Sequence, residues 1–134
     1  MRTWSQASQK VYDELTPGLQ RFVTRMRDEV CDVKLLCGHR GQEEQDLALA
    51  TGNSKLAWPH GKHNRLPSTA VDMQPSPAPS GWQLHAALGY MAGCGRQIAK
   101  EEGIAVRWGG DWDSDGDLAD QSFNDLYHWE ELDK

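Results

Sequence analysis

No run of 18 apolar residues occurs in this chain of 134 residues, so the sequence offers no candidate for a membrane-spanning helix. The opening segment from Met1 to Leu15 also lacks the apolar stretch and the small-residue cleavage site of a signal peptide. We therefore expect a protein that is made in the cytoplasm without a signal peptide and has no membrane partner.

Cysteine is scarce, and its three positions, Cys31, Cys37 and Cys94, form no CxxC pair. An odd number of cysteines in a chain without a secretion signal favours free thiols over a disulfide framework. We expect these thiols to be reduced and mostly buried.

Positive charge is also limited, because 14 Lys and Arg residues stand against 20 Asp and Glu residues, for a net charge of −6. The acidic residues concentrate from Glu101 onward, which argues against a nucleic-acid partner. Arg21, Arg25 and Arg27 fall on a predicted helix, where a solvated face is favoured over an anionic partner.

The residues that are present suit one α+β domain over residues 1–134. Thr16 and Pro17 fit an N-cap followed by proline at the first helical position, and apolar residues then recur at helical spacing up to Val30. Such signals predict helices at about 5–15, 17–30, 42–52 and 82–103, and strands at about 32–38, 69–73, 104–110 and 127–132. This order indicates a small antiparallel sheet packed with helices.

Two stretches carry more specific expectations. The prolines of "QPSPAPSG" should end the preceding strand at Met73. In the long helix, Trp82 and Ala86 are among the apolar residues available for burial, and Gly93 and Gly95 predict close packing against a neighbour.

Two histidine-containing segments supply the candidates for chemistry. "GKHNRLPSTAVDM" places His63 nine residues before Asp72, which by spacing alone is a weak metal-binding signal. "DLYHWEEL" adds His128, with Asp125 just before it and Glu130 on the same face of the predicted strand. A catalytic zinc needs three protein ligands, an open position for water and a carboxylate that accepts a proton. His63, Asp72 and His128 could be the ligands, Asp125 the base, and Glu130 the partner that supports His128.

Taken together, these motifs resemble a family of zinc peptidases that includes D-alanyl-D-alanine carboxypeptidases and phage L-alanyl-D-glutamate peptidases. The family pattern opens with S/G-K-H, continues with A-[VI]-D and ends with [DE]-x-x-H-x-E. An upstream G-x-R is followed by glutamine, and a G-[GA]-D-W turn comes later. The matching segments here are 61–63, 70–72, 125–130, 38–40 with Gln42 and Gln45, and "RWGGDWD" at 107–113.

The resemblance implies a catalytic domain of the hedgehog/D-Ala-D-Ala peptidase type, with Zn²⁺ held by His63, Asp72 and His128 and with Asp125 as the general base. It implies an endolysin that cleaves the L-alanyl-D-glutamate bond of peptidoglycan stem peptides. We expect a monomer that acts on the cell wall in the periplasm after holin-type release. The alternatives are a D-alanyl-D-alanine carboxypeptidase or dipeptidase and a non-catalytic zinc- or calcium-binding module.

Two features of the proposed ligand segment depart from the family pattern. The stretch from His63 to Asp72 is longer than the H-x-x-G-x-A-x-D version of many members. His60 also competes with His63 for the ligand role, although Lys62 and Asn64 flank His63 as the pattern requires.

Arg40 is the predicted positive charge of the site. The resemblance implies that it stabilises the oxyanion or binds a substrate carboxylate, because a fixed guanidinium near developing negative charge lowers the barrier. Glu43 and Glu44 follow closely, so an ion pair with either of them is the alternative role.

The acidic loop "DWDSDGD" matches the first part of the calcium-binding D-x-D-x-D-G pattern. Its twelfth position is Ser122 rather than glutamate, and no pair of helices is predicted to flank it. A Ca²⁺ site and a solvated acidic turn both remain open. The candidate ligands are Asp111, Asp113, Asp115 and Asp117.

Overall fold

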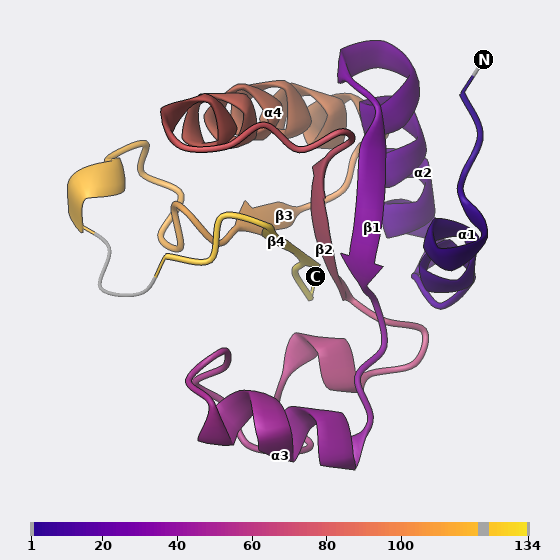
Figure 1. The fold of residues 1–134 in the computed structure, drawn as a ribbon, viewed down its shortest axis with the longest axis vertical. Coiled ribbons are helices and arrows are strands. Elements are labelled where there is room, and N and C mark those ends of the chain that lie inside the picture. The colour runs from indigo at the N-terminus through magenta and orange to yellow at the C-terminus, as the bar shows by residue number, and fades with distance from the viewer. Residues whose placement is uncertain (1, 121–123, 134) are drawn as a thin grey trace.

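A computed structural model describes residues 2–120 and 124–133 of the chain, and its helices and sheet confirm the predicted α+β class (Figure 1). The helices are α1 (Gln6–Asp13), α2 (Pro17–Arg25), α3 (Gln42–Ala50) and α4 (Trp82–Glu102), with short turns η1 (Met26–Val30), η2 (Lys62–Asn64) and η3 (Leu118–Asp120). The strands are β1 (Val33–Cys37), β2 (Ala70–Pro75), β3 (Val106–Trp108) and β4 (His128–Glu131). Within these described ranges, none of the helices combines the length and apolar character needed to cross a membrane.

The strands form one antiparallel sheet in the order β1-β2-β4-β3. This order places the last strand of the chain beside β2, and in that pairing Asp72 lies opposite His128. Side chains of directly opposed residues in an antiparallel pair lie close together. The sheet therefore joins two candidate ligands that are far apart in the sequence. Figure 1 shows α3 at one end of the sheet, away from α1, α2 and α4.

Helix α2 begins where the sequence predicted. The Thr16 side chain accepts a hydrogen bond from a backbone N–H of the first turn, and Pro17 follows at the first position. The sequence predicted one helix up to Val30. The α-helix instead ends at Arg25, and a π-turn begins at Met26. There the N–H of Cys31 donates to the carbonyl of Met26, five residues earlier, at 3.1 Å.

The three arginines of α2 and η1 interact with side chains of other segments of the chain. Arg21 and Arg25 form ion pairs with Glu102 of α4 at 3.2 and 3.3 Å. Arg27 is only 7% exposed, and its guanidinium lies 4.5 Å from the centre of the Trp4 ring. These contacts attach α2 and η1 to neighbouring elements, so the three arginines do not form one solvated face.

Strand β2 continues past Met73 to Pro75, and the predicted end of this strand is therefore wrong. Pro75 pairs with Val33 as the last residue of the ladder, where the missing N–H of proline is tolerated. The N–H of Ser76 then donates to the carbonyl of Asp32 at 2.9 Å, and the strand ends there.

The core lies between α2, α4 and the sheet, and it confirms one of the two glycine predictions. A Cβ at Gly95 would lie 2.8 Å from the Trp129 ring, whereas one at Gly93 would have no neighbour within 4 Å. Trp82 and Ala86 were expected to be available for burial, but Trp82 is 75% exposed and Ala86 is also exposed. The buried apolar residues that form this core include Leu19, Phe22, Val23, Met26, Leu35, Val71, Met73, Leu88, Met91, Ile98 and Trp129.

The three cysteines are free, as expected, but each is only partly buried.

Candidate metal centre

The three predicted ligands meet at one point. His63 lies in η2, Asp72 in β2, and His128 is the first residue of β4. His63 Nε2 is 3.2 Å from His128 Nδ1, and each of these nitrogens is 3.1 Å from Asp72 Oδ1. Ligand atoms about 2.0 Å from a tetrahedral zinc ion lie about 3.3 Å apart. The three atoms therefore form a triangle with the size of one face of a tetrahedral zinc site.

The second nitrogen of each histidine is already engaged. His63 Nδ1 lies 2.6 Å from the carbonyl oxygen of Gly38, and His128 Nε2 lies 3.0 Å from Glu130 Oε1. A neutral imidazole carries one proton, and these acceptors hold it on the outer nitrogens. The inner nitrogens then turn their lone pairs toward Asp72, an arrangement typical of metal-binding histidines. The donor set fits a metal cation.

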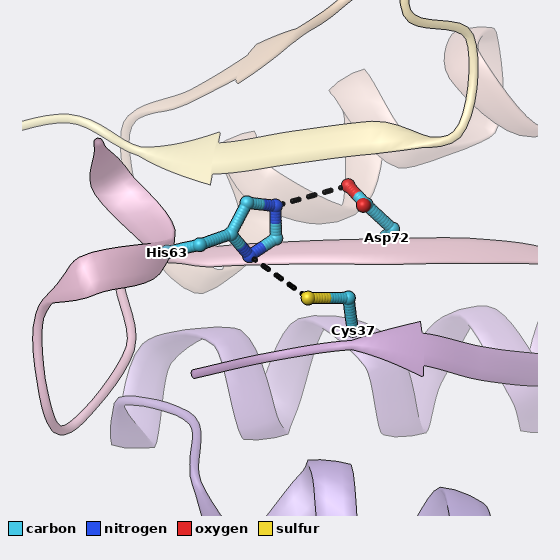
Figure 2. Close-up of side chains that lie close together, drawn as sticks. All are labelled: Cys37, His63 and Asp72. Atoms are coloured by element: carbon cyan, nitrogen blue, oxygen red, sulfur yellow. Dashed lines mark hydrogen bonds and ion pairs between the residues drawn. The ribbon is translucent and has the colours of Figure 1, made fainter. Parts of the chain in front are cut away.

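Cys37 lies beside the same histidine, and the sequence did not predict it near the site. Figure 2 shows one ring nitrogen of His63 facing Asp72 and the other facing Cys37. His63 Nε2 is 3.1 Å from Asp72 Oδ1, and His63 Nδ1 is 3.8 Å from Cys37 Sγ. Cys37, His63 and Asp72 form one group of potential metal ligands, and Asp72, Asp125 and His128 form another. Asp72 belongs to both groups, so this carboxylate is the centre of the cluster.

The chain between His63 and Asp72 is a compact loop. It has to be, because this segment is longer than the H-x-x-G-x-A-x-D pattern and both of its ends reach the same cluster. The N–H of Arg40 donates to the carbonyl of His63 at 2.6 Å, which fixes the backbone of η2. The Ser68 hydroxyl donates to the carbonyl of Gly38 at 3.0 Å, and Ser68 is fully buried. Hydrogen bonds to the segment after β1 thus place His63 beside Asp72.

Burial and hydrogen bonding have opposite effects on the charges of this cluster. Burial alone would lower the pKa of His63, but its contacts with Asp72 and Cys37 raise that pKa to about 10. Burial alone would raise the pKa of Asp72, but hydrogen bonds with His128 and His63 hold that pKa well below its usual range. Burial also opposes the charged form of His128, yet Asp72 and Glu130 raise its pKa. The cluster therefore favours positive charge at its centre, either as protons or as a metal cation.

Asp125 lies in the turn that enters β4. Its carbonyl accepts a hydrogen bond from the N–H of His128 at 3.0 Å, and its Oδ2 lies 4.0 Å from His128 Nδ1. A side chain at Gly109 would collide with the backbone of Asp125, which explains a glycine of the "RWGGDWD" motif. Burial and the nearby charge of Asp72 raise the pKa of Asp125. A raised pKa suits a carboxylate that must accept and then release a proton.

Arg40 is held by a buried glutamine rather than by an acidic residue. Its Nη1 donates to Gln45 Oε1 at 3.0 Å, and the same oxygen accepts a hydrogen bond from Asn64 at 3.0 Å. Gln45 has no exposed surface. In the part of the chain that the structure describes, no ion pair joins Arg40 to Glu43 or Glu44, so the alternative predicted for Arg40 is not observed.

A cavity of about 490 Å³ adjoins the cluster, and several of the residues that the sequence singled out line it. His60 lines it, but among residues 2–120 and 124–133 it joins none of the groups of potential metal ligands. The competitor for the role of His63 is therefore near the site without converging on it. The cavity is also lined by Arg40, Lys62, His63, Arg107, Trp112, Asp125, His128 and Glu130.

Arg107 and Trp112 had no predicted role, although both belong to the "RWGGDWD" motif. Arg107 Nη2 donates to Glu130 Oε2 at 3.0 Å. The guanidinium carbon of Arg107 lies 5.4 Å from the centre of the Trp112 ring, and that ring lies 5.4 Å from the ring of His128. These two residues therefore extend the wall of the cavity beyond His128.

The acidic loop forms a second cluster, and its Asp113 also lines the cavity. Asp111, Asp113 and Asp115 are close enough to hold a cation, but Asp117 is not part of this group. Asp111 Oδ2 accepts from the N–H of Gly116 at 2.9 Å, and Asp115 Oδ1 accepts from the N–H of Asp117 at 2.8 Å. Ser122 lies outside the described residues. Calcium binding by this loop stays a prediction.

Comparison with known proteins places the chain in a family. The family model described as "Phage L-alanyl-D-glutamate peptidase" matches residues 2–132. The chain belongs to this family. It is a peptidase, as the sequence motifs predicted.

A solved structure supports the same fold for this peptidase. The Serratia marcescens L-Ala D-Glu endopeptidase ChiX superposes with a TM-score of 0.72 and 22% sequence identity. The match covers 96% of this chain and 89% of the other. No curated protein matches the chain.

Proposed function

We propose that the chain is a zinc-dependent endopeptidase that hydrolyses the L-alanyl-D-glutamate bond of peptidoglycan stem peptides. The triangle of His63 Nε2, Asp72 Oδ1 and His128 Nδ1, with sides of 3.1 to 3.2 Å, is the observation that carries this proposal. Membership in the phage peptidase family supports the bond, and the chemistry of the donor set supports zinc.

Zinc bound by these three residues would act as a Lewis acid that makes water a nucleophile near neutral pH. Asp125 accepts the proton of the attacking water and delivers it to the amine that leaves. Its position beside His128 and its raised pKa suit both steps. Glu130 accepts the outer N–H of His128 and so fixes the tautomer that presents Nδ1.

Arg40 lines the same cavity and supplies positive charge for the oxyanion that forms at the scissile carbonyl. The hydrogen bond with buried Gln45 holds the guanidinium before the substrate arrives. A donor held in place in advance does not have to reorganise during the reaction, which is why such groups lower the barrier.

The whole chain would work as one catalytic domain and as a monomer. A family of phage peptidases fits an enzyme that acts on the host cell wall late in infection. We propose that it reaches the periplasm through a holin-type pore.

Purified peptidoglycan, incubated with the zinc-loaded protein and with Asp125→Ala, tests this function by mass spectrometry of the released fragments. We expect fragments that begin with the free amine of D-glutamate from the wild type and almost none from Asp125→Ala. Release of terminal D-alanine instead would identify a carboxypeptidase. Bound zinc without any cleavage would identify a binding module.

His60→Ala is the matched control for the ligand set, because His60 lines the cavity without joining the cluster. We expect His63→Ala to lose bound zinc and His60→Ala to retain it. Retained zinc in His63→Ala would refute this choice of ligand.

A further inference from the structure

Glu130 divides its carboxylate between two partners. Oε1 lies 3.0 Å from His128 Nε2, and Oε2 accepts a hydrogen bond from Arg107 Nη2 at 3.0 Å. Arg–carboxylate pairs are often bidentate, with two parallel hydrogen bonds. Here the second oxygen is already used by His128, so Glu130 satisfies only one of the five N–H donors of Arg107.

Within residues 2–120 and 124–133, Glu130 is the one acceptor that receives a hydrogen bond from the Arg107 guanidinium. Nε is buried, and among the residues that the structure describes it has no hydrogen-bond partner. The Arg107 side chain is 35% exposed, whereas that of Glu130 is 4% exposed. The ion pair is therefore asymmetric, with its carboxylate inside the protein and part of its guanidinium at the surface of the cavity.

Trp112 packs against both Arg107 and His128. The centre of its ring is 5.4 Å from the guanidinium carbon of Arg107 and 5.4 Å from the centre of the His128 ring. A guanidinium that stacks on an aromatic ring keeps its in-plane N–H groups for a planar anion such as a carboxylate. Arg107 is thus held on two sides, by Glu130 and by Trp112, at a position on the cavity wall next to a proposed metal ligand.

The proposed substrate carries a suitable anion. The amine of D-glutamate forms the scissile amide with alanine, and one of the two carboxyl groups of glutamate continues the stem peptide. The other carboxyl group stays free and negatively charged unless it is amidated. It is close to the scissile bond, since both are attached to the same glutamate.

We propose that Arg107 binds this free carboxylate and makes the enzyme selective for stem peptides with acidic rather than amidated glutamate. The inference rests on the proposed function. It assigns different roles to the two arginines that line the cavity. Arg40 acts on the scissile carbonyl of alanine, and Arg107 recognises the glutamate on the other side of the scissile bond.

The test uses two synthetic stem peptides that differ only in this group, one with the free carboxylate and one with the carboxamide. We expect kcat/KM of the wild type to be about 10- to 100-fold higher for the acidic peptide, as a charge-assisted hydrogen-bonded pair permits. Arg107→Gln should reduce this ratio to within about threefold, and Arg107→Lys should keep an intermediate ratio because the charge remains. The control is Arg21→Gln, a surface arginine paired with Glu102, which should keep the wild-type ratio.

The ratio distinguishes recognition from support of Glu130. If Arg107→Gln cleaves both peptides more slowly by the same factor, Arg107 acts only through Glu130 and the inference is overturned. If the wild type cleaves both peptides equally well, the inference fails while the proposed function stands. If the zinc-loaded wild type cleaves neither peptide, the proposed function itself fails.

Discussion

The cluster around Asp72 and the acidic loop around Asp113 both looked like metal sites in the sequence, yet their atoms are used differently. Around Asp72 the ligand atoms come from η2, β2 and β4 and converge to within 3.2 Å. In the loop the carboxylates come from one short segment, and some of their oxygens accept hydrogen bonds from its backbone, as Asp111 Oδ2 does from the N–H of Gly116.

The difference shows what prepares a group of polar residues for a cation. The outer nitrogen of His63 lies against the carbonyl of Gly38 and that of His128 against Glu130, so that their inner nitrogens are left for a metal. In the loop, the N–H of Gly116 engages Oδ2 of Asp111, whereas the buried Oδ1 of Asp111 has no hydrogen-bond partner among the described residues. The turn therefore uses only part of this carboxylate.

Replacing His128 with alanine should have the largest effect. It removes one corner of the triangle and the partner of Glu130, so we expect loss of bound zinc and a fall in cleavage of at least about 1000-fold, since metal catalysis is worth several kcal/mol. Zinc per chain, measured by elemental analysis, and fragment release from peptidoglycan would check it. A variant that still binds one zinc per chain would contradict the ligand set.

Asp125→Asn should come next, because it keeps the shape of the side chain and removes its basicity. We expect cleavage to fall by about 100- to 10,000-fold, the usual contribution of a general base. Zinc content should stay at the wild-type value, since Asp125 is not a member of the proposed triangle. Wild-type kcat in this variant would show that another group takes the proton.

Glu130→Gln should have an intermediate effect. The amide oxygen can still accept from His128, but the negative charge that holds His128 and Arg107 is lost. We expect zinc affinity to fall by about 10- to 100-fold, as for other partners of metal-binding histidines. Competition with a chelator of known affinity measures this, and Glu101→Gln at the exposed ion pair with Arg25 is the control. Equal affinities in the two variants would mean that Glu130 does not tune the site.

The sequence predicted the parts of this site that depend on local signals or on whole motifs. The capped start of α2 at Thr16 and the glycine stop of α4 at Gly103 follow from residue chemistry. The π-turn at Met26 carries no local signal, so a single helix to Val30 was the natural prediction.

The partners of the site were harder to predict because they depend on tertiary structure. Cys37 and His63 belong to segments joined only by the fold, and no spacing rule relates them. Arg107 reaches Glu130 across the β3–β4 pairing, in which these two residues are opposite each other. That register exists only once the sheet order is known.

Changing the acidic loop should have the smallest effect. In the double variant Asp115→Asn, Asp117→Asn, the amide oxygens can still accept the N–H groups of Asp117 and Ala119, so we expect the free energy of unfolding to change by no more than about 0.5 kcal/mol. Zinc content and cleavage should stay within about twofold of the wild type. Thermal unfolding of the wild type with and without added Ca²⁺ completes the comparison, and we expect equal midpoints. A rise with Ca²⁺ that the double variant abolishes would mean that the loop is a metal site after all, since a ligand that binds only the folded state must stabilise it.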